Sequence, residues 1–247
     1  MLEINKIYNQ DCLEGMKLIN DKSIDMILCD LPYGQTARNK WDTQLPFDQL
    51  WKQYERIIKD NGIIILFANG MFTADLMTSN KKLWKYNLVW NKVLPSGFLN
   101  AKKMPMRSHE DICIFYKKPP KYNPQMVEGN ECHSRGNVIG KKQEDFSRNT
   151  NYGELKAVQT EGNLKYPKSI LTFQKPHPST TIHPTQKPVE CLEWLIKTYT
   201  NENELILDNC VGSGSTIVAA INTNRNYIGF ELEENYYKAA LERINKI

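Results

Sequence analysis

Long apolar runs are missing from this chain of 247 residues. No stretch approaches the roughly 20 apolar residues that a membrane-spanning helix needs, so no membrane segment is expected. The first six positions already include the polar or charged residues Glu3, Asn5 and Lys6, which is not the pattern expected of a secretory signal peptide. Its six cysteines include no C-x-x-C pair, and Cys132-His133 offers two adjacent ligands without partners. We therefore expect reduced thiols, a cytoplasmic location and no metal site.

Two familiar nucleotide-binding patterns are also incomplete. An apolar strand expected over 205–208 runs into a glycine-rich turn at 212–214. A dinucleotide-binding turn would carry a third glycine where this chain has Ile217, and no Walker lysine is present. Glu231 ends the next expected strand, where it can accept hydrogen bonds from ribose hydroxyls. The turn therefore favours an adenosyl ligand without a pyrophosphate.

The most informative motif, Asp30-Leu31-Pro32-Tyr33, follows the apolar run 26–29. That run predicts a buried strand, which the proline ends at an exposed tip. The tip presents a carboxylate, main-chain carbonyls and an aromatic ring. These groups suit a planar base with an exocyclic amine, because the oxygens accept its N–H bonds and the ring stacks on it. Taken alone, the motif is equally consistent with an ordinary strand-to-loop turn.

Together these segments resemble the S-adenosylmethionine-dependent amino-methyltransferases of DNA, which methylate adenine N6 or cytosine N4. Residues 30–33 resemble the family's catalytic D/N/S-P-P-Y motif, with Leu31 where proline is usual, and residues 208–216 resemble its methionine-binding loop. His183 to Pro188 (HPTQKP) is similar to the segment that precedes this loop, and Asn9 to Leu13 is similar to the turn that contacts the cofactor's adenine. The catalytic motif comes first and the cofactor loop last, which is the order of the beta class.

The resemblance implies a role for each site residue. The catalytic motif is Asp30, Leu31, Pro32 and Tyr33: Tyr33 stacks on a flipped-out base, while Asp30 and the Leu31 carbonyl accept the N–H bonds of its amine. S-adenosylmethionine is the implied cofactor. The residues that hold it are Asp11 for the adenine, Glu231 for the ribose, Thr185 and Lys187 for the carboxylate, Asp208, Gly212, Gly214 and Thr216 for the methionine moiety, and Asp30 beside the methyl group.

Periodicity along the chain predicts a doubly wound α/β sheet, and the resemblance implies a mostly parallel one of the seven-stranded methyltransferase type. Strands are expected over 23–29, 63–67, 87–90, 111–116, 205–208 and 227–230, and helices over 47–59, 71–79, 216–224 and around 236–244. Asn61-Gly62 is expected to close the first of these helices. The expected domains are a catalytic half over 1–116, a target-recognition insertion over 117–182 and a cofactor-binding half over 183–247.

The regular hydrophobic periodicity of the chain fades between residues 117 and 182. This segment carries 11 lysine and arginine residues against 6 acidic ones, a net charge of +5, whereas the whole chain carries only +4. A basic, irregular segment with interleaved aromatics is typical of a DNA-reading insertion, and a solvated surface region is the alternative. Lys102, Lys103, Arg107 and His109 resemble the family's basic segment near the DNA.

We therefore expect a site-specific DNA methyltransferase that flips adenine out of double-stranded DNA and methylates its N6 atom. Cytosine N4 is the alternative target, and an RNA or protein N-methyltransferase is less favoured because those families usually carry Asn first. A cytosine-C5 enzyme would need a Pro-Cys dipeptide, which the chain lacks. Homodimers are common in the class, so a homodimer stays open, as does a role in restriction-modification, a phage or regulation.

Overall fold

The computed structural model describes residues 2–34, 42–129, 163–177, 179, 181 and 185–247. Cys132, His133, His183 and Pro184 therefore lie outside the described residues, as does much of the predicted insertion. The chain forms two compact units. The larger unit contains Met1–Asn123 and Lys168–Ile247, and the smaller one is Pro124–Pro167. In the smaller unit β6 (Val127–Glu128) pairs antiparallel with β7 (Leu164–Lys165).

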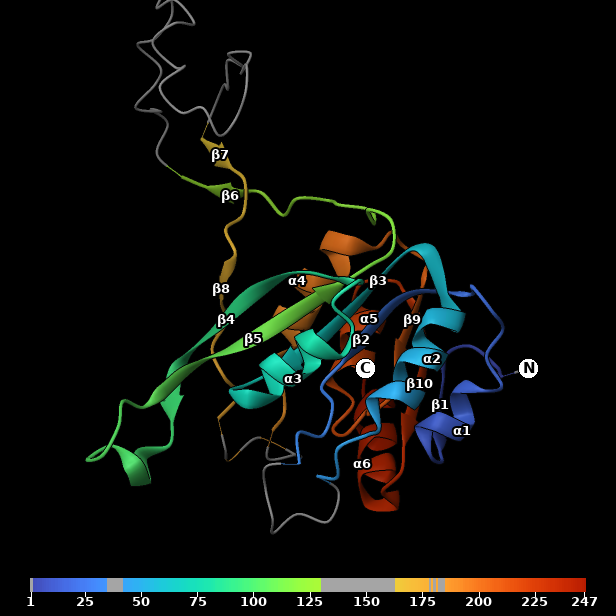
Figure 1. The fold of residues 1–247 in the computed structure, drawn as a ribbon, viewed down its shortest axis with the longest axis horizontal. Helices are drawn as coiled ribbons and strands as arrows, with labels where there is room; N and C mark the ends of the chain where they lie inside the picture. Colours follow the sequence, from blue (N-terminus) through green and yellow to red (C-terminus); the bar gives the residue numbers. More distant parts are fainter. Residues whose placement is uncertain (1, 35–41, 130–162, 178, 180, 182–184) are drawn as a thin grey trace, which may run out of the picture. The chain divides into compact units, whose positions relative to one another are not determined.

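Within the described residues, an eight-stranded sheet runs through the larger unit in the order β1-β10-β9-β2-β3-β5-β4-β8 (Figure 1). Its strands are β1 (Lys6–Asn9), β2 (Ile24–Cys29), β3 (Ile58–Ala68), β4 (Trp84–Ser96), β5 (Arg107–Phe115), β8 (Ile170–Thr172), β9 (Leu205–Asp208) and β10 (Asn226–Glu231). Neighbouring strands are parallel except that β5 runs antiparallel to β3 and β4. The predicted mostly parallel, doubly wound sheet is confirmed.

Helices cover both faces of this sheet (Figure 1). One apolar cluster joins the sheet to α4 (Val189–Tyr199), α5 (Ser215–Asn222) and α6 (Glu234–Ile244). A second joins its other face to α1 (Cys12–Met16), α2 (Phe47–Ile57) and α3 (Met71–Ser79). Along β3, alternate residues enter the two clusters, which explains why its sequence is a continuous apolar run rather than an alternating one. None of the helices that the structure describes is long and apolar enough to cross a membrane.

Two element boundaries differ from the expectations. Helix α2 ends at Ile57, and Ile58 already has an extended backbone, so Asn61-Gly62 lies inside β3 instead of closing the helix. A Cβ atom at Gly62 would lie 2.9 Å from the Asp25 carbonyl oxygen, so this glycine permits close packing between β2 and β3. In addition, Ile170–Thr172 of the predicted insertion pairs with β4 as an edge strand of the main sheet.

The positive charge of segment 117–182 is not evenly spread. Residues 124–167 carry six lysine and arginine residues and six acidic ones, so the smaller unit has no net charge. The surplus consists of the flanking residues Lys117, Lys118, Lys121, Lys168 and Lys175. Lys118 is ion-paired with Asp60, and Lys121 with Glu204. Net charge therefore does not single out the smaller unit as a DNA-binding surface.

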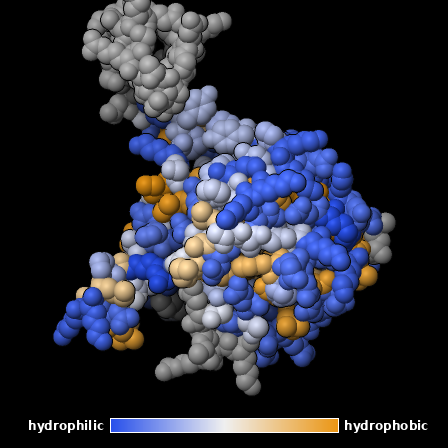
Figure 2. All heavy atoms as spheres, in the orientation of Figure 1, coloured by the Kyte–Doolittle hydropathy of each residue, from blue (hydrophilic) through white to orange (hydrophobic). Residues whose placement is uncertain are grey.

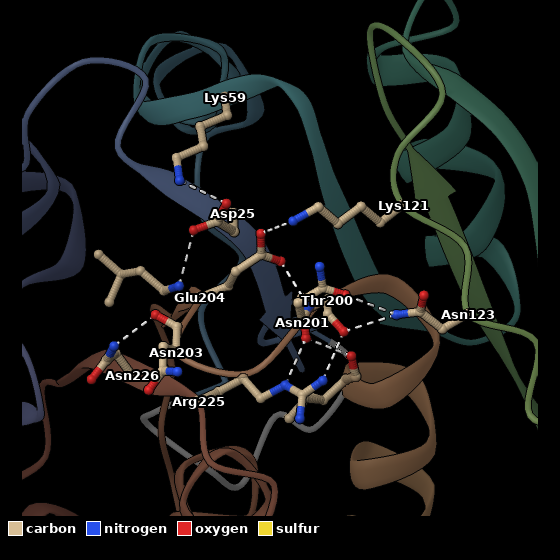
Figure 3. Close-up of polar contacts among 12 residues, drawn as sticks. Asp25, Lys59, Lys121, Asn123, Thr200, Asn201, Asn203, Glu204, Arg225 and Asn226 are labelled. Atoms are coloured by element: carbon tan, nitrogen blue, oxygen red, sulfur yellow. Dashed lines mark hydrogen bonds and ion pairs between the residues drawn. The ribbon is translucent and has the colours of Figure 1, made fainter.

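A polar cluster fixes the larger unit at the point where the chain leaves it (Figure 3). The Asn123 side chain donates hydrogen bonds to the carbonyls of Lys197 and Thr200, at 3.2 and 3.1 Å, and its backbone N–H donates to the Thr198 carbonyl at 2.7 Å. Arg225 Nη2 donates to the same Thr200 carbonyl at 2.7 Å. The last residue before the smaller unit is therefore held by the end of α4.

A hairpin arm extends from the sheet where β4 passes through the short 3-10 helix η1 (Phe98–Asn100) into β5 (Figure 1). Between positions 93 and 109 it carries Lys102, Lys103 and Arg107 but no acidic residue. Phe98 and Leu99 at its tip are 76% and 82% exposed. Figure 2 shows hydrophobic and hydrophilic residues together on this arm.

Candidate functional site

The strand order brings four acidic residues to one edge of the sheet. β2 and β9 are parallel neighbours, and the chain continues from β2 toward β3 but from β9 toward β10. Ligands of open α/β sheets bind outside the carboxyl ends of the strands at such a switch point. Asp30 follows β2, Asp208 ends β9, Glu231 ends β10 and Asp11 lies just after β1.

A cavity of about 620 Å³ opens at this edge, which is within the size range of small-molecule sites. All but one of the residues predicted for the site line it: Asp11, Asp30, Leu31, Pro32, Tyr33, Thr185, Lys187, Asp208, Gly212, Thr216 and Glu231. The exception is Gly214, which directly precedes α5, has a φ of 79° and lies against Ala240. The fold thus gathers motifs from both ends of the chain around one space, while their individual roles stay predictions.

Both oxygens of the Asp30 carboxylate have partners. Its Oδ1 accepts a hydrogen bond of 2.8 Å from the Tyr33 hydroxyl, and its Oδ2 accepts one of 2.5 Å from the Lys187 ammonium. Burial raises the pKa of Asp30, the Lys187 ammonium acts against that rise, and the neighbouring Glu110 carboxylate adds to it. Each oxygen keeps a second lone pair for a further donor. Asp30 is thus a fixed acceptor in a mostly buried setting.

Lys187 connects Asp30 to a second carboxylate, Glu110 on β5. The Lys187 ammonium lies 3.3 Å from Glu110 Oε2, and Lys92 on β4 lies 3.1 Å from Glu110 Oε1. Burial acts to lower the pKa of Lys187, but the two carboxylates outweigh it and hold the pKa above its usual range. The predicted contact of Lys187 with a cofactor carboxylate stays a prediction, since its nearest described charges are those of Asp30 and Glu110.

The Tyr33 ring already has one stacking partner. Its centroid lies 4.6 Å from that of Phe72 on α3, with an angle of 25° between the planes. A planar ligand in the cavity would therefore stack on the opposite face of Tyr33.

Trp90 also borders the cavity. Its indole N–H donates to the Phe173 carbonyl at 2.8 Å, and Trp90 is almost fully buried. Trp90 therefore forms part of both the core and the cavity wall.

The glycine-rich turn is tied to the tip of the next strand by Glu231. Its Oε2 accepts a hydrogen bond of 2.7 Å from the Gly212 N–H, and its Oε1 accepts one of 2.8 Å from the Glu233 N–H. Gly212 has a φ of 53°, which a side chain would disfavour. Asp208 is 2% exposed, and this burial raises its pKa to about 7, although its Oδ1 accepts from the Cys210 N–H at 3.1 Å.

Two other predicted residues, Asp11 and Thr185, also border the cavity. Asp11 caps α1, because its Oδ1 accepts from the backbone N–H groups of Leu13 and Glu14 at 2.8 and 3.1 Å. Capping alone explains an aspartate there, and Asp11 also borders the cavity. Thr185, which is itself exposed, borders the cavity from the segment before α4.

Several residues of the site carry no local signal in the sequence. Glu110 was not predicted because it comes before the buried apolar part of β5, and only the antiparallel direction of β5 brings it to the edge where β2 and β3 end. Asn209 accepts a 2.5 Å hydrogen bond from Tyr54 on α2, a partner far away in the chain. Tyr236 of α6, inside a helix expected only from its spacing, also lines the cavity.

The comparisons with known proteins agree on one family. The profile of the N6/N4 family, described as DNA methylase, matches residues 24–242. The type II methyltransferase M1.MboII of Moraxella bovis is 27% identical over 266 residues, covering 100% of this chain and 99% of that protein. YubD of Escherichia coli (strain K12), described as a methylase, is 50% identical over 248 residues, covering 98% and 90%.

Two solved structures share the fold. The M1.HpyAVI–SAM complex has a TM-score of 0.62 at 23% identity and covers 96% of this chain and 98% of its own. The PvuII DNA methyltransferase, named as cytosine-N4-specific, has a TM-score of 0.69 at 16% identity and covers 98% and 87%.

Proposed function

Because the chain belongs to the N6/N4 family of DNA methylases, we propose that it transfers a methyl group from S-adenosylmethionine to adenine N6 of a flipped-out base in duplex DNA. One observation carries this proposal. The Asp30 carboxylate, held by Tyr33 and Lys187, lines the same cavity as Asp208, Gly212 and Glu231. A base acceptor and an adenosyl-ligand site thus share one space. A DNA substrate also agrees with the cytoplasmic location expected from the sequence.

The residues of the cavity fit S-adenosylmethionine. Glu231 and Asp208 offer acceptors at the tips of adjacent strands, which suits ribose hydroxyls and a methionine ammonium. Gly212 lets a ligand approach the backbone closely. Thr185 and Lys187 are cavity-lining donors for its carboxylate, and Asp11 borders the same space. When bound, the cofactor supplies an electrophilic methyl group on a positively charged sulfur.

The chain's own groups would then activate and orient the amine. An exocyclic amine is a poor nucleophile, because its lone pair is delocalised into the ring. Asp30 and the Leu31 carbonyl accept its N–H bonds, which returns electron density to nitrogen, while Tyr33 stacks on the base. Flipping costs a few kcal/mol, and alignment by fixed dipoles in the cavity lowers the barrier to transfer. A neutral aryl amine is a weak acid, so its proton leaves only as the nitrogen becomes cationic, and it passes to the Asp30 carboxylate that accepts its N–H bond and from there to solvent.

The choice of adenine rests on the first residue of the catalytic motif. Enzymes that resemble this chain and begin the motif with Asp mostly methylate adenine, whereas Ser is commoner for cytosine N4. Asp30 therefore favours N6, and the likeness to the cytosine-N4-specific PvuII enzyme keeps N4 as the second candidate.

Product identification tests the function directly. We expect labelled methyl groups to enter duplex DNA but not RNA or protein, and nucleosides from the digested DNA to contain N6-methyladenine by mass. N4-methylcytosine as the sole product would refute the adenine assignment and leave amine methylation standing. Label in RNA or protein alone would refute the DNA substrate. Mapping the modified positions in DNA from expressing cells would give the recognition sequence.

We place the phosphate contacts on the β4–β5 arm and keep residues 117–182 as the target-recognition segment. The arm adjoins the cavity, because Ser96 and Arg107 belong to its lining, and it has no acid to repel phosphates. The role of 117–182 rests on the family resemblance, because its smaller unit is electrically balanced.

The arm proposal predicts a salt effect. Replacing Lys102 and Lys103 together with Gln should weaken DNA binding and lower the slope of log Kd against log salt by roughly one for each phosphate that the arm no longer neutralises. Cofactor affinity should stay unchanged. The matched control replaces Lys82 and Lys85, exposed residues at the opposite end of β4, with Gln. Equal decreases in affinity in the two double variants, measured by titration across a salt series, would contradict the assignment.

A further inference from the structure

We propose that Glu110 is a positioning residue for methyl transfer: it accepts the Lys187 ammonium when the amine of the target base displaces that ammonium from Asp30. The inference rests on the proposed function, in which Asp30 holds the amine. It assigns a role to a residue outside every motif noted in the sequence.

Four charged side chains form one continuous network beside the cavity. Their signs alternate in the order Asp30, Lys187, Glu110 and Lys92, and the successive ion-pair distances are 2.5, 3.3 and 3.1 Å. Exposed fractions of these side chains are 22%, 7%, 15% and 4%, so the side chains of Lys187 and Lys92 are almost completely buried. The network is electrically neutral as a whole, which makes its burial tolerable.

The two carboxylates hold Lys187 differently. Asp30 Oδ2 accepts a 2.5 Å hydrogen bond from the ammonium. Glu110 Oε2 lies within ion-pair distance of it but is a buried oxygen without a hydrogen bond among the described residues. Oε1 of the same carboxylate already accepts from Lys92 at 3.1 Å. A small movement of the Lys187 ammonium would therefore trade its bond to Asp30 for one to Glu110.

Such a trade would strengthen Asp30 as a hydrogen-bond acceptor for the target amine. Lys187 and Tyr33 already donate to its two oxygens, and the target amine must donate there as well. A carboxylate tied closely to one ammonium is a poorer acceptor, because the cation withdraws its negative charge. With Glu110 sharing the ammonium, Asp30 recovers acceptor strength without leaving a buried cation unpaired. Lys92 keeps Glu110 ionised and in place.

The charges around Asp30 determine whether each substitution raises or lowers the pKa of Asp30. The Asp30 carboxylate faces Tyr33, Lys187 and Glu110, and Asp208 lies on the neighbouring strand β9. Lys187 also lies 5.1 Å from the centroid of the Phe67 ring. Because Glu110 raises the pKa of Asp30, Glu110→Gln should lower it. Lys92→Met should raise it, because Glu110 loses the cation that partly neutralises it.

The decisive measurement is titration of the Asp30 carboxyl carbon in ¹³C-aspartate-labelled protein, without cofactor or DNA. Asp30→Asn identifies the resonance. We expect the two variants to shift the Asp30 midpoint in opposite directions, with the Glu110→Gln, Lys92→Met double variant between them.

In steady-state assays, Glu110→Gln should lower kcat by roughly 10- to 100-fold, as when residues that orient metal ligands are removed. KM for DNA and cofactor affinity should change less than about twofold, and the acid limb of the kcat profile should move with the titration.

Glu193→Gln is the matched control, because Glu193 forms a helix-surface pair with Lys197 outside the network. It should change neither the titration nor kcat. Shifts in the same direction for Glu110→Gln and Lys92→Met, or none, would overturn the positioning role. If Glu110→Gln fails to fold, Lys92→Met decides alone, since an unmoved or lowered Asp30 midpoint refutes the coupling. A wild-type protein that methylates no amine in DNA would instead refute the proposed function, and the titration would still report on the network.

Discussion

Asp30→Ala should bind S-adenosylmethionine nearly as tightly as the wild type yet lose roughly 10²–10³-fold in kcat, the cost of removing one fixed electrostatic contact to a reacting group. The amine then lacks the carboxylate that aligns it and enriches its nitrogen. The cofactor acceptors Asp208 and Glu231 belong to other strands and are untouched. Single-turnover methylation at saturating cofactor, with a separate cofactor titration, gives both quantities.

Two further variants separate chemistry from damage to the fold. Asp30→Asn keeps the size of the side chain, so a similar loss in kcat would not come from a cavity. Tyr33→Phe removes the 2.8 Å hydrogen bond to Asp30 but keeps the ring that stacks on Phe72, so its loss should be smaller. Full turnover in Asp30→Ala would eliminate the proposed mechanism.

The second large effect concerns Asp208, whose pKa burial raises to about 7. The folded state therefore favours the neutral carboxyl. Its contribution to stability is fully present below the ordinary pKa near 4 and is lost as pH rises through about 7. Asp208→Asn cannot ionise, so without cofactor it should melt higher than the wild type at pH 8, by roughly 2–4 °C for each kcal/mol recovered, but not at low pH.

The same substitution should weaken cofactor binding. A hydrogen bond to a charged acceptor contributes about 1.5–3 kcal/mol, so Asp208→Asn should bind S-adenosylmethionine roughly 10- to 150-fold more weakly at pH 8. Wild-type affinity should rise with pH through about 7, and the variant should show no such rise. Calorimetric titration and thermal melts at both pH values test this. Asp60→Asn, at an exposed carboxylate paired with Lys22, is the control. Undiminished affinity in Asp208→Asn would remove Asp208 from the cofactor site.

Local sequence was sufficient to predict the residues that follow apolar strands. Asp30 and Asp208 were recognisable because each comes directly after a buried run, and parallel strands bring such tips to one edge. The end of α2 was mispredicted because Asn61-Gly62 matches a helix stop, whereas Gly62 is needed for strand packing against Asp25. Tertiary contact overrode the local signal.

The charge network beside Asp30 could not be predicted in this way. Glu110 contacts both Lys187 and Lys92 because β5 runs antiparallel to its neighbours, and the direction of a strand within a sheet cannot be read from a short stretch of sequence. For a related reason, the net charge of segment 117–182 does not show which of its residues are available to DNA. A count over a range does not separate Lys118 and Lys121, which pair with acids of the larger unit, from the residues of the smaller one.

The attachment of Asn123 to the end of α4 has a consequence for how such enzymes diversify (Figure 3). The chain departs from the larger unit at a residue held by three carbonyls, and it returns at β8, which is hydrogen-bonded to β4. Lengthening a loop between fixed ends has a small entropic cost, about 0.6 kcal/mol of folding free energy for each doubling of the loop length. Recombination between these two points could therefore exchange segments of different length while the cavity and its charges are inherited unchanged.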